Sequence, residues 1–220
     1  MKRPVLFAAA AAVLLPVLVA APGYAPKKKK APFTGVNFAH RGLHSRDRSV
    51  PENSMKAFEL AASAGYGIEL DVQLSKDGQV VVFHDDTLDR VCGVHSRVEE
   101  KTLEELQSLR LCETQETVPL FTDVLRLIDG RSPLIVELKT GKRNNELCEK
   151  TAAILREYKG DVCIESFDPL IVFWFRRHAG EFIRGQLAMR ADKYALKLRL
   201  LRIGCSLTLF NLLTRPHFIA

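Results

Sequence analysis

Residues 68–85 read IELDVQLSKDGQVVVFHD. Two apolar runs, Ile68–Leu74 and Val80–Phe83, flank Lys76-Asp77-Gly78, which is typical of a tight turn between strands. The second run is apolar at every position, as in a strand that is buried on both faces of a covered sheet. Carboxylates lie within the first run, and a histidine directly follows the second. The stretch therefore predicts two strands that carry chemically active side chains.

The same pattern of strand and helix continues on both sides of this stretch. Further apolar runs predict strands over residues 36–40, 134–138, 162–167, 182–188 and 217–220. Helical spacing and capping signals predict helices that begin at Asn53, Thr102, Thr122, Asn144 and Asp168-Pro169. Repeated alternation favours a parallel α/β fold. Seven strands are one fewer than a closed barrel needs, so we predict a TIM-barrel, (β/α)8-like fold that is truncated before its last strand.

The charge of the chain is unevenly distributed. The 220 residues have a formal net charge of +6, yet residues 31–183 contain 19 basic and 25 acidic residues. A nucleic-acid binder would show a basic functional face, whereas this region favours a cation as ligand. The five cysteines are odd in number and form no CxxC pair, which disfavours a zinc cage or a complete disulfide framework.

The N-terminus predicts a targeting segment. Met1-Lys2-Arg3 precedes the apolar stretch Val5–Ala21, which fits a secretory signal peptide or an uncleaved membrane anchor. We favour an anchor, because cleavage after Ala25 would leave Pro26 next to the cut. Lys27–Lys30 could then rest on anionic lipid.

We expect a leader over residues 1–25, a linker over 26–35 and one barrel domain over 36–220. The chain would then be exported or anchored to a membrane, with its orientation undecided. A basic amphipathic stretch over residues 193–202 fits either a solvated helix face or a surface that contacts lipid.

Three carboxylates are the candidate metal ligands. Glu69 and Asp71 lie two residues apart on one strand, so they face the same side. Inward-facing carboxylates are costly unless a positive charge lies between them. With Glu137 they form an all-oxygen set that suits Mg²⁺ or Ca²⁺. The alternatives are acids on the surface of a strand, or an ion pair of these acids with Lys139.

Histidines and cations follow the same strand ends. His40 and His84 could divide general-base and general-acid work near neutral pH. Arg41 and Lys139 could hold phosphate oxygens, or they could balance nearby carboxylates. Glu52 could be a further metal ligand, could orient Arg41, or could favour a helix N-terminus. Together these groups indicate a metal-assisted attack on phosphate.

A set of motifs carries a family resemblance. They are AHRG (39–42), PENS (51–54), IELDVQLSKDG (68–78), VVFHD (81–85) and IVELK (135–139), with the weaker ESFDP (165–169) and RGQL (184–187). In their order and spacing the chain resembles the glycerophosphodiester phosphodiesterase family over about residues 36–220. The resemblance implies a TIM barrel with an inserted segment after the first strands. It also implies hydrolysis of glycerophosphodiesters to an alcohol and glycerol 3-phosphate with a divalent cation.

The resemblance assigns roles to the candidate residues. It implies His40 and His84 as the catalytic pair, Glu69, Asp71 and Glu137 as metal ligands, Arg41 and Lys139 as phosphate contacts, and Glu52 as an accessory ligand or orienting group. The Trp-Thr-Val-type motif that usually marks the last strand of the family has no counterpart in this chain. An open barrel with an incomplete pocket is therefore expected.

Two other functions fit the same residues. One is a phospholipase that acts on lysophospholipid or phosphoinositide and releases a lipid phosphate or a cyclic phosphate. The other is an inactive module that binds phosphate or lipid. The expected partners are a small-molecule glycerophosphodiester and a membrane surface, without nucleic acid. No pattern in the chain indicates an oligomeric state.

Overall fold

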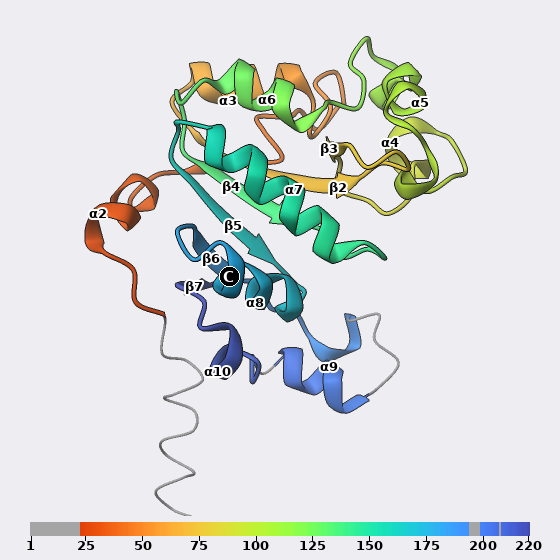
Figure 1. Ribbon diagram of the computed structural model, residues 1–220. Coiled ribbons are helices and arrows are strands. Elements are labelled where there is room, and N and C mark those ends of the chain that lie inside the picture. The colour runs from red at the N-terminus through yellow and green to blue at the C-terminus, as the bar shows by residue number, and fades with distance from the viewer. Residues whose placement is uncertain (1–22, 194–198, 207) are drawn as a thin grey trace, which may run out of the picture.

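The computed structural model describes residues 23–193, 199–206 and 208–220, and its main feature is one sheet flanked by helices (Figure 1). The strands are β1 Phe38–His40, β2 Gly67–Leu74, β3 Val80–Val82, β4 Leu134–Leu138, β5 Val162–Ser166, β6 Ile183–Gln186 and β7 Phe218–Ile219. All seven correspond to predicted strands. Residues 1–22, which make up most of the leader predicted over 1–25, lie outside the described residues.

The sheet is a partial TIM barrel. The strands β1, β2, β4, β5, β6 and β7 lie in this order, and each neighbouring pair is parallel. This arrangement confirms the predicted TIM-barrel-like fold. The prediction was wrong in counting β3 among the barrel strands, because β3 pairs antiparallel with β2 and lies off this path. The described sheet therefore contains six parallel strands.

A tight turn explains why β3 runs backwards. Gly78 has a φ of 77°, a left-handed conformation that glycine adopts without strain. A Cβ at this position would also displace the ends of the Lys150 and Arg143 side chains. The turn returns the chain along β2, so that Val82 pairs with Val72.

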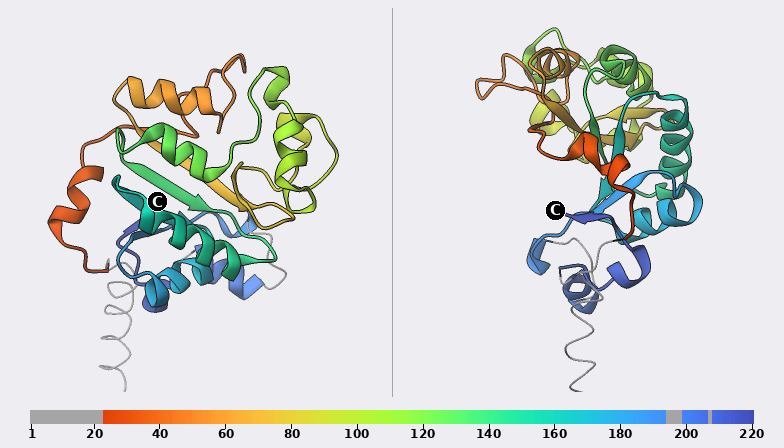
Figure 2. Two further views of the ribbon diagram at one scale, coloured as in Figure 1. Left: turned by 45° about the horizontal axis from the view of Figure 1, so that its top comes forward. Right: turned by 90° about the vertical axis from the view of Figure 1, so that its left-hand side faces the viewer.

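The helices are short, and most of them follow strands. They are α2 Lys27–Lys30, α3 Met55–Ser63, α4 Asp89–Cys92, α5 Leu103–Ser108, α6 Phe121–Ile128, α7 Asn144–Glu157, α8 Pro169–His178, α9 Arg199–Ser206 and α10 Asn211–Thr214, with 3₁₀ turns at Ala31–Phe33, Val98–Glu100, Leu111–Glu113 and Ala191–Lys193. The turned views show α7 and α8 along one side of the sheet (Figure 2). No described helix has the length and apolar character that crossing a bilayer requires.

Capping confirms two predicted helix starts and corrects two. Thr102 forms the predicted capping box, and Asp168 caps α8 with proline at the first position. The cap of α3 is Ser54, whose Oγ accepts from the Ala57 N–H, and not Asn53 as predicted. Thr122 lies inside α6, which begins after Leu120. Both corrections shift a helix start by one or two residues, the usual uncertainty at helix ends.

Alternation along the strands separates the core from the site. Val72 and Leu138 pair in register, and both belong to the main apolar core. The residues that alternate with them along each strand point to the opposite face of the sheet. On that face Asp71 pairs with Glu137, and Glu137 pairs with Glu165 on the next strand. The sheet thus places a row of carboxylates on the face away from its main apolar core.

A second apolar cluster forms the inserted segment that the resemblance implied. Its buried members are Val81, Phe83, Leu88, Val91, Val98, Leu106, Leu111 and Val118. Helices α4 and α5 belong to this segment, which lies beside the end of β2 (Figure 1). Part of the predicted basic stretch, residues 194–198, lies outside the described residues. All five cysteines lie within them and are free thiols.

Candidate active site

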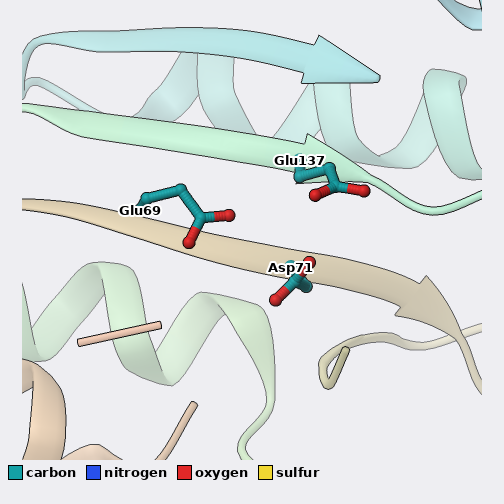
Figure 3. Close-up of side chains that lie close together, drawn as sticks. All are labelled: Glu69, Asp71 and Glu137. Atoms are coloured by element: carbon teal, nitrogen blue, oxygen red, sulfur yellow. The ribbon is translucent and has the colours of Figure 1, made fainter. Parts of the chain in front are cut away.

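Three buried carboxylates form the centre of the site. Glu69 and Asp71 extend from β2, and Glu137 extends from β4 (Figure 3). One oxygen from each residue lies within 4.8 Å of the others. The parallel pairing of β2 with β4 creates this arrangement, because it sets Asp71 directly opposite Glu137.

This carboxylate cluster has the properties of a cation site. Burial and the charge of Asp71 raise the pKa of Glu69 to about 8. Burial also raises the pKa of Glu137, although Lys139 works in the opposite direction. The buried Asp71 Oδ1 accepts no hydrogen bond from the described residues, and Lys139 Nζ lies 3.4 Å from it. A buried cluster in which three carboxylates outnumber the two nearby cations, Lys139 and Arg41, fits a divalent cation, and its all-oxygen donor set suits Mg²⁺ or Ca²⁺.

The raised pKa of Glu69 predicts how stability changes with pH. The side chain ionises near 4.5 when unfolded and near 8 when folded, so the folded state holds the extra proton between these values. The free energy of unfolding of the metal-free chain should therefore fall as pH rises from about 4.5 to about 8. Urea unfolding with a chelator present measures this slope, which Glu69→Gln should reduce.

Two controls make that experiment specific. Glu104→Gln changes an exposed carboxylate on α5 and should leave the slope unchanged. Mg²⁺ or Ca²⁺ should raise stability most at the alkaline end, where the cluster is most negative. If the free energy of unfolding depends on pH equally in the unaltered protein and in Glu69→Gln, folding does not raise the pKa of Glu69.

His40 lies at the end of β1, next to the cluster. Its Nε2 lies 3.8 Å from Glu69 Oε2, while 66% of its side chain remains exposed. Partial loss of water and the charge of Arg41 lower the pKa of His40, which favours the neutral ring. The backbone turns sharply here: the Arg41 N–H donates to Glu69 Oε2, and a side chain at Gly42 would collide with Ala57.

His84 follows β3 and is oriented by its neighbour Asp85. Nδ1 of His84 lies 2.6 Å from Asp85 Oδ1. Burial works against ionisation of Asp85, but hydrogen bonds from Arg90 and His84 hold its pKa below the usual range. An ionised carboxylate only accepts hydrogen bonds, so Nδ1 of His84 carries the proton and Nε2 is left for chemistry. Gln73 fixes the loop by donating to the carbonyls of Phe83 and Asp85.

The two predicted phosphate contacts are engaged with carboxylates. Arg41 Nη1 lies 2.9 Å from Glu52 Oε1, and Arg41 Nε lies 3.7 Å from Asp71 Oδ2. Lys139 Nζ lies 2.8 Å from Glu137 Oε1. Burial opposes the charge on Lys139, but Glu137 and Asp71 outweigh it and raise its pKa. Both cations therefore lie at the carboxylate cluster. In this structure they form ion pairs with carboxylates, which is the alternative to phosphate contact that the sequence left open.

Glu52 lies in the PENS loop and contacts arginines. Its carboxylate accepts hydrogen bonds from Arg41 and Arg90, which together lower its pKa to about 2 against the opposing effect of burial. It is not part of the group of three carboxylates that could share an ion. Of the roles weighed for Glu52, its contacts support the one in which it orients Arg41.

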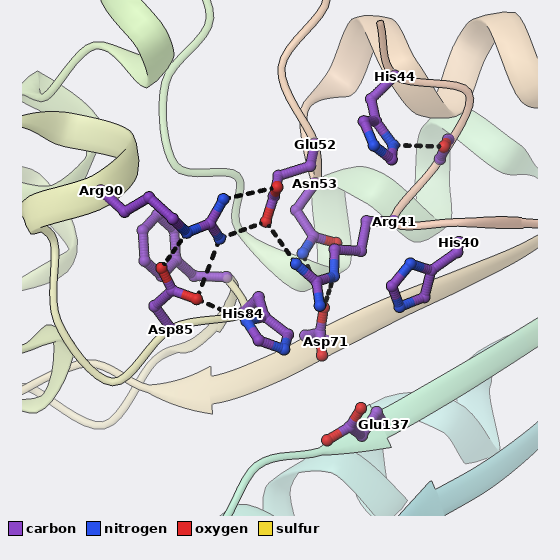
Figure 4. A network of polar contacts seen from close by, with 12 residues as sticks. His40, Arg41, His44, Glu52, Asn53, Asp71, His84, Asp85, Arg90 and Glu137 are labelled. Carbon is purple, nitrogen blue, oxygen red and sulfur yellow. Dashed lines mark hydrogen bonds and ion pairs between the residues drawn. The ribbon is translucent and has the colours of Figure 1, made fainter. Parts of the chain in front are cut away.

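Three residues at the site were missed by the sequence analysis. Asn53 is buried and donates from Nδ2 to Asp71 Oδ2, at 2.9 Å. Glu165 continues the row of carboxylates on β5, where burial and Glu137 raise its pKa to about 7. Arg90 comes from α4 and contacts both Glu52 and Asp85 (Figure 4). Asn53 and Glu165 stood inside quoted motifs, but Arg90 follows no strand and carried no signal.

Comparison with known proteins identifies the family. The model of the Glycerophosphoryl diester phosphodiesterase family matches residues 40–203. The chain belongs to this family. A family member from Caldanaerobacter subterraneus, a glycerophosphodiester phosphodiesterase, is 38% identical in an alignment of 141 residues, and the match covers 59% of this chain and 57% of that protein. A lysophospholipase D of Mus musculus is 31% identical in an alignment of 156 residues, and the match covers 65% of this chain and 48% of that protein.

Solved structures of the family share the fold. A phosphodiesterase from Oleispira antarctica, in complex with the product sn-glycerol-3-phosphate, matches with a TM-score of 0.66 and 27% identity, over 79% of this chain and 73% of that chain. A glycerophosphodiester phosphodiesterase from Thermotoga maritima matches with a TM-score of 0.61 and 25% identity, over 84% of this chain and 72% of that chain. The chain spans about half the length of the curated relatives that it matches.

Proposed function

We propose that this protein is a cation-dependent phosphodiesterase that hydrolyses glycerophosphodiesters to an alcohol and glycerol 3-phosphate. One observation carries the proposal: Glu69, Asp71 and Glu137 are buried with oxygens within 4.8 Å of one another, and His40 lies at their edge. Family membership supports it, as does the glycerol phosphate product in the complex from Oleispira antarctica.

The side chains divide the reaction between them. Glu69, Asp71 and Glu137 would hold a divalent cation, which supplies charge neutralisation at a phosphodiester oxygen and lowers the pKa of a nucleophile. Arg41, still held by Glu52, and Lys139 would contact phosphate oxygens and stabilise the negative charge that develops there. Lys139 contributes a point charge, whereas the fork of Arg41 can hold two oxygens.

The two histidines would move the protons. One imidazole removes a proton from the attacking water, or from the neighbouring glycerol hydroxyl if a cyclic phosphate forms first. A new P–O bond then forms as the bond to the leaving alcohol breaks, and the other imidazole protonates the departing alkoxide. On the cyclic route, water then opens the cyclic phosphate to give glycerol 3-phosphate. For His84 the reacting atom is Nε2, because Asp85 holds Nδ1.

A lysophospholipid is the second candidate substrate. The relative from Mus musculus is named a lysophospholipase D. The bond that breaks would be the same, between phosphate and head-group alcohol, but the product would be an acylated glycerol phosphate. The two candidate substrates would thus use the same site, and they differ in whether the glycerol carries an acyl chain.

Product identification tests the proposal. The purified chain should convert glycerophosphocholine to glycerol 3-phosphate and choline with Mg²⁺ or Ca²⁺ present, as followed by phosphorus NMR. Lysophosphatidylcholine in a parallel reaction decides between the two substrates. Release of phosphocholine would mean that the other ester bond is cleaved, and no turnover of either substrate would refute the proposed activity.

A further inference from the structure

We propose that Arg90 is a positioning residue of the active site, which acts by joining Glu52 to Asp85. Through these carboxylates it would hold the guanidinium of Arg41 and the ring of His84 in working orientation. The inference rests on the proposed function for its effect on turnover, but its effect on the ring of His84 does not require activity.

The guanidinium of Arg90 makes four hydrogen bonds to two carboxylates. Nε and Nη2 donate to Asp85 Oδ2 and Oδ1, at 2.6 and 3.0 Å. Nη1 and Nη2 donate to Glu52 Oε2 and Oε1, at 2.9 and 2.6 Å. Two edges of one planar group are thus used in paired contacts, a geometry that fixes both carboxylates in position and angle.

Each carboxylate has a further partner in the reaction machinery. Glu52 Oε1 also accepts from Arg41 Nη1 at 2.9 Å, and Asp85 Oδ1 lies 2.6 Å from His84 Nδ1. A continuous chain therefore runs from Arg41 through Glu52, Arg90 and Asp85 to His84 (Figure 4). In this view the rings of His84 and His40 lie on opposite sides of Asp71.

Arg90 is held in place by the packing of its helix, although 42% of its side chain is exposed. It lies on α4, between the buried Leu88 and Val91 of the second apolar cluster. The inserted segment thus holds the arginine against two loops that follow different strands. Without the guanidinium of Arg90, the carboxylates of Glu52 and Asp85 would lose the cation that joins them, and Glu52 would keep its contact with Arg41. Asp85 would then be free to rotate away from Nδ1 of His84.

Lysine should not replace Arg90. An ammonium group is a single point of charge and cannot make paired contacts with two carboxylates at once. Arg90→Lys should therefore keep the charge but lose the angular control of Asp85. This difference separates a positioning role from simple charge balance.

The test compares Arg90→Ala and Arg90→Lys with Arg97→Ala as the matched control. Arg97 lies in the same inserted segment, is 40% exposed and pairs with Asp86 and Glu99 rather than with Glu52 or Asp85. We expect Arg90→Ala to lower kcat by about ten- to a hundredfold with little change in KM, the scale seen for groups that orient reacting side chains. Arg90→Lys should recover little, and Arg97→Ala should match the unaltered protein.

Nitrogen NMR of the histidine rings gives a readout without turnover. In the unaltered chain His84 should carry its proton on Nδ1, with the signal assigned by its loss in His84→Ala. Arg90→Ala and Arg90→Lys should shift this signal towards a mixture of the two tautomers, while Arg97→Ala should not.

The outcomes separate the inference from the proposed function. An inactive unaltered chain whose His84 signal still responds to Arg90→Lys supports the positioning role and refutes the proposed activity. An active chain in which kcat and the His84 signal survive Arg90→Lys overturns the inference, because an ammonium group then suffices. Arg90→Lys also decides the matter if thermal unfolding shows that Arg90→Ala does not fold.

Discussion

Asp71→Asn should lower kcat on glycerophosphocholine by at least about a thousandfold. The substitution keeps the shape of the side chain but removes the charge at the centre of the carboxylate cluster. Losing the charge stabilisation of a bound cation costs several kcal/mol in the transition state, and about 1.4 kcal/mol corresponds to a tenfold change in rate. Turnover measured across a range of Mg²⁺ and Ca²⁺ concentrations checks this prediction.

Cation binding itself should weaken in the same variant. Calorimetry should detect Mg²⁺ or Ca²⁺ binding to the unaltered chain but little binding to Asp71→Asn. Asp123→Asn is the matched control, because Asp123 is a partly exposed carboxylate on α6 that pairs with Arg126, outside the carboxylate cluster. If Asp71→Asn retains both cation affinity and turnover, Asp71 is not a ligand and the site needs a different assignment.

His40→Ala and His84→Ala should each reduce kcat by at least about a hundredfold, the usual scale of general acid–base catalysis. His95→Ala should have no comparable effect, because its ring is fully exposed and pairs with Asp89. Steady-state kinetics on glycerophosphocholine measure all three variants. Near-normal turnover in either of the first two would remove that histidine from proton transfer.

The leaving group separates the roles of the two histidines. A substrate that releases p-nitrophenolate needs no proton on its leaving oxygen. The variant that lacks the general acid should therefore recover most of its rate on this substrate, whereas the variant that lacks the general base should not. Equal recovery in both variants would contradict a division of labour.

The strand pattern was enough to predict the centre of the site. Glu69 and Asp71 alternate with apolar residues along β2, so their common direction follows from strand geometry alone. Glu137 has the same position on the next parallel strand, and register then brings it beside Asp71. Local alternation and parallel pairing together specify this cluster, and both can be read from a sequence.

The remaining features depend on contacts that a local pattern does not encode. Asn53 and Ser54 are both good capping residues, but in the structure Asn53 donates to Asp71 and Ser54 caps α3, and this choice involves a tertiary contact. The apolar run of β3 fits a parallel strand as well as a hairpin arm. Arg90 reaches the site because a separate apolar cluster holds α4 in place, and no periodicity in the sequence reveals that packing.

The reversal at Gly78 has a consequence for the order in which the site is built. Asp71 and His84 belong to one hairpin, so a short loop brings them together at small entropic cost. Glu137 arrives on a strand far later in the chain, and its contact with Asp71 must await long-range pairing of β2 with β4. The approach of His84 to Asp71 is therefore local, whereas Glu137 and His40 reach the site only when β4 and β1 pair with β2.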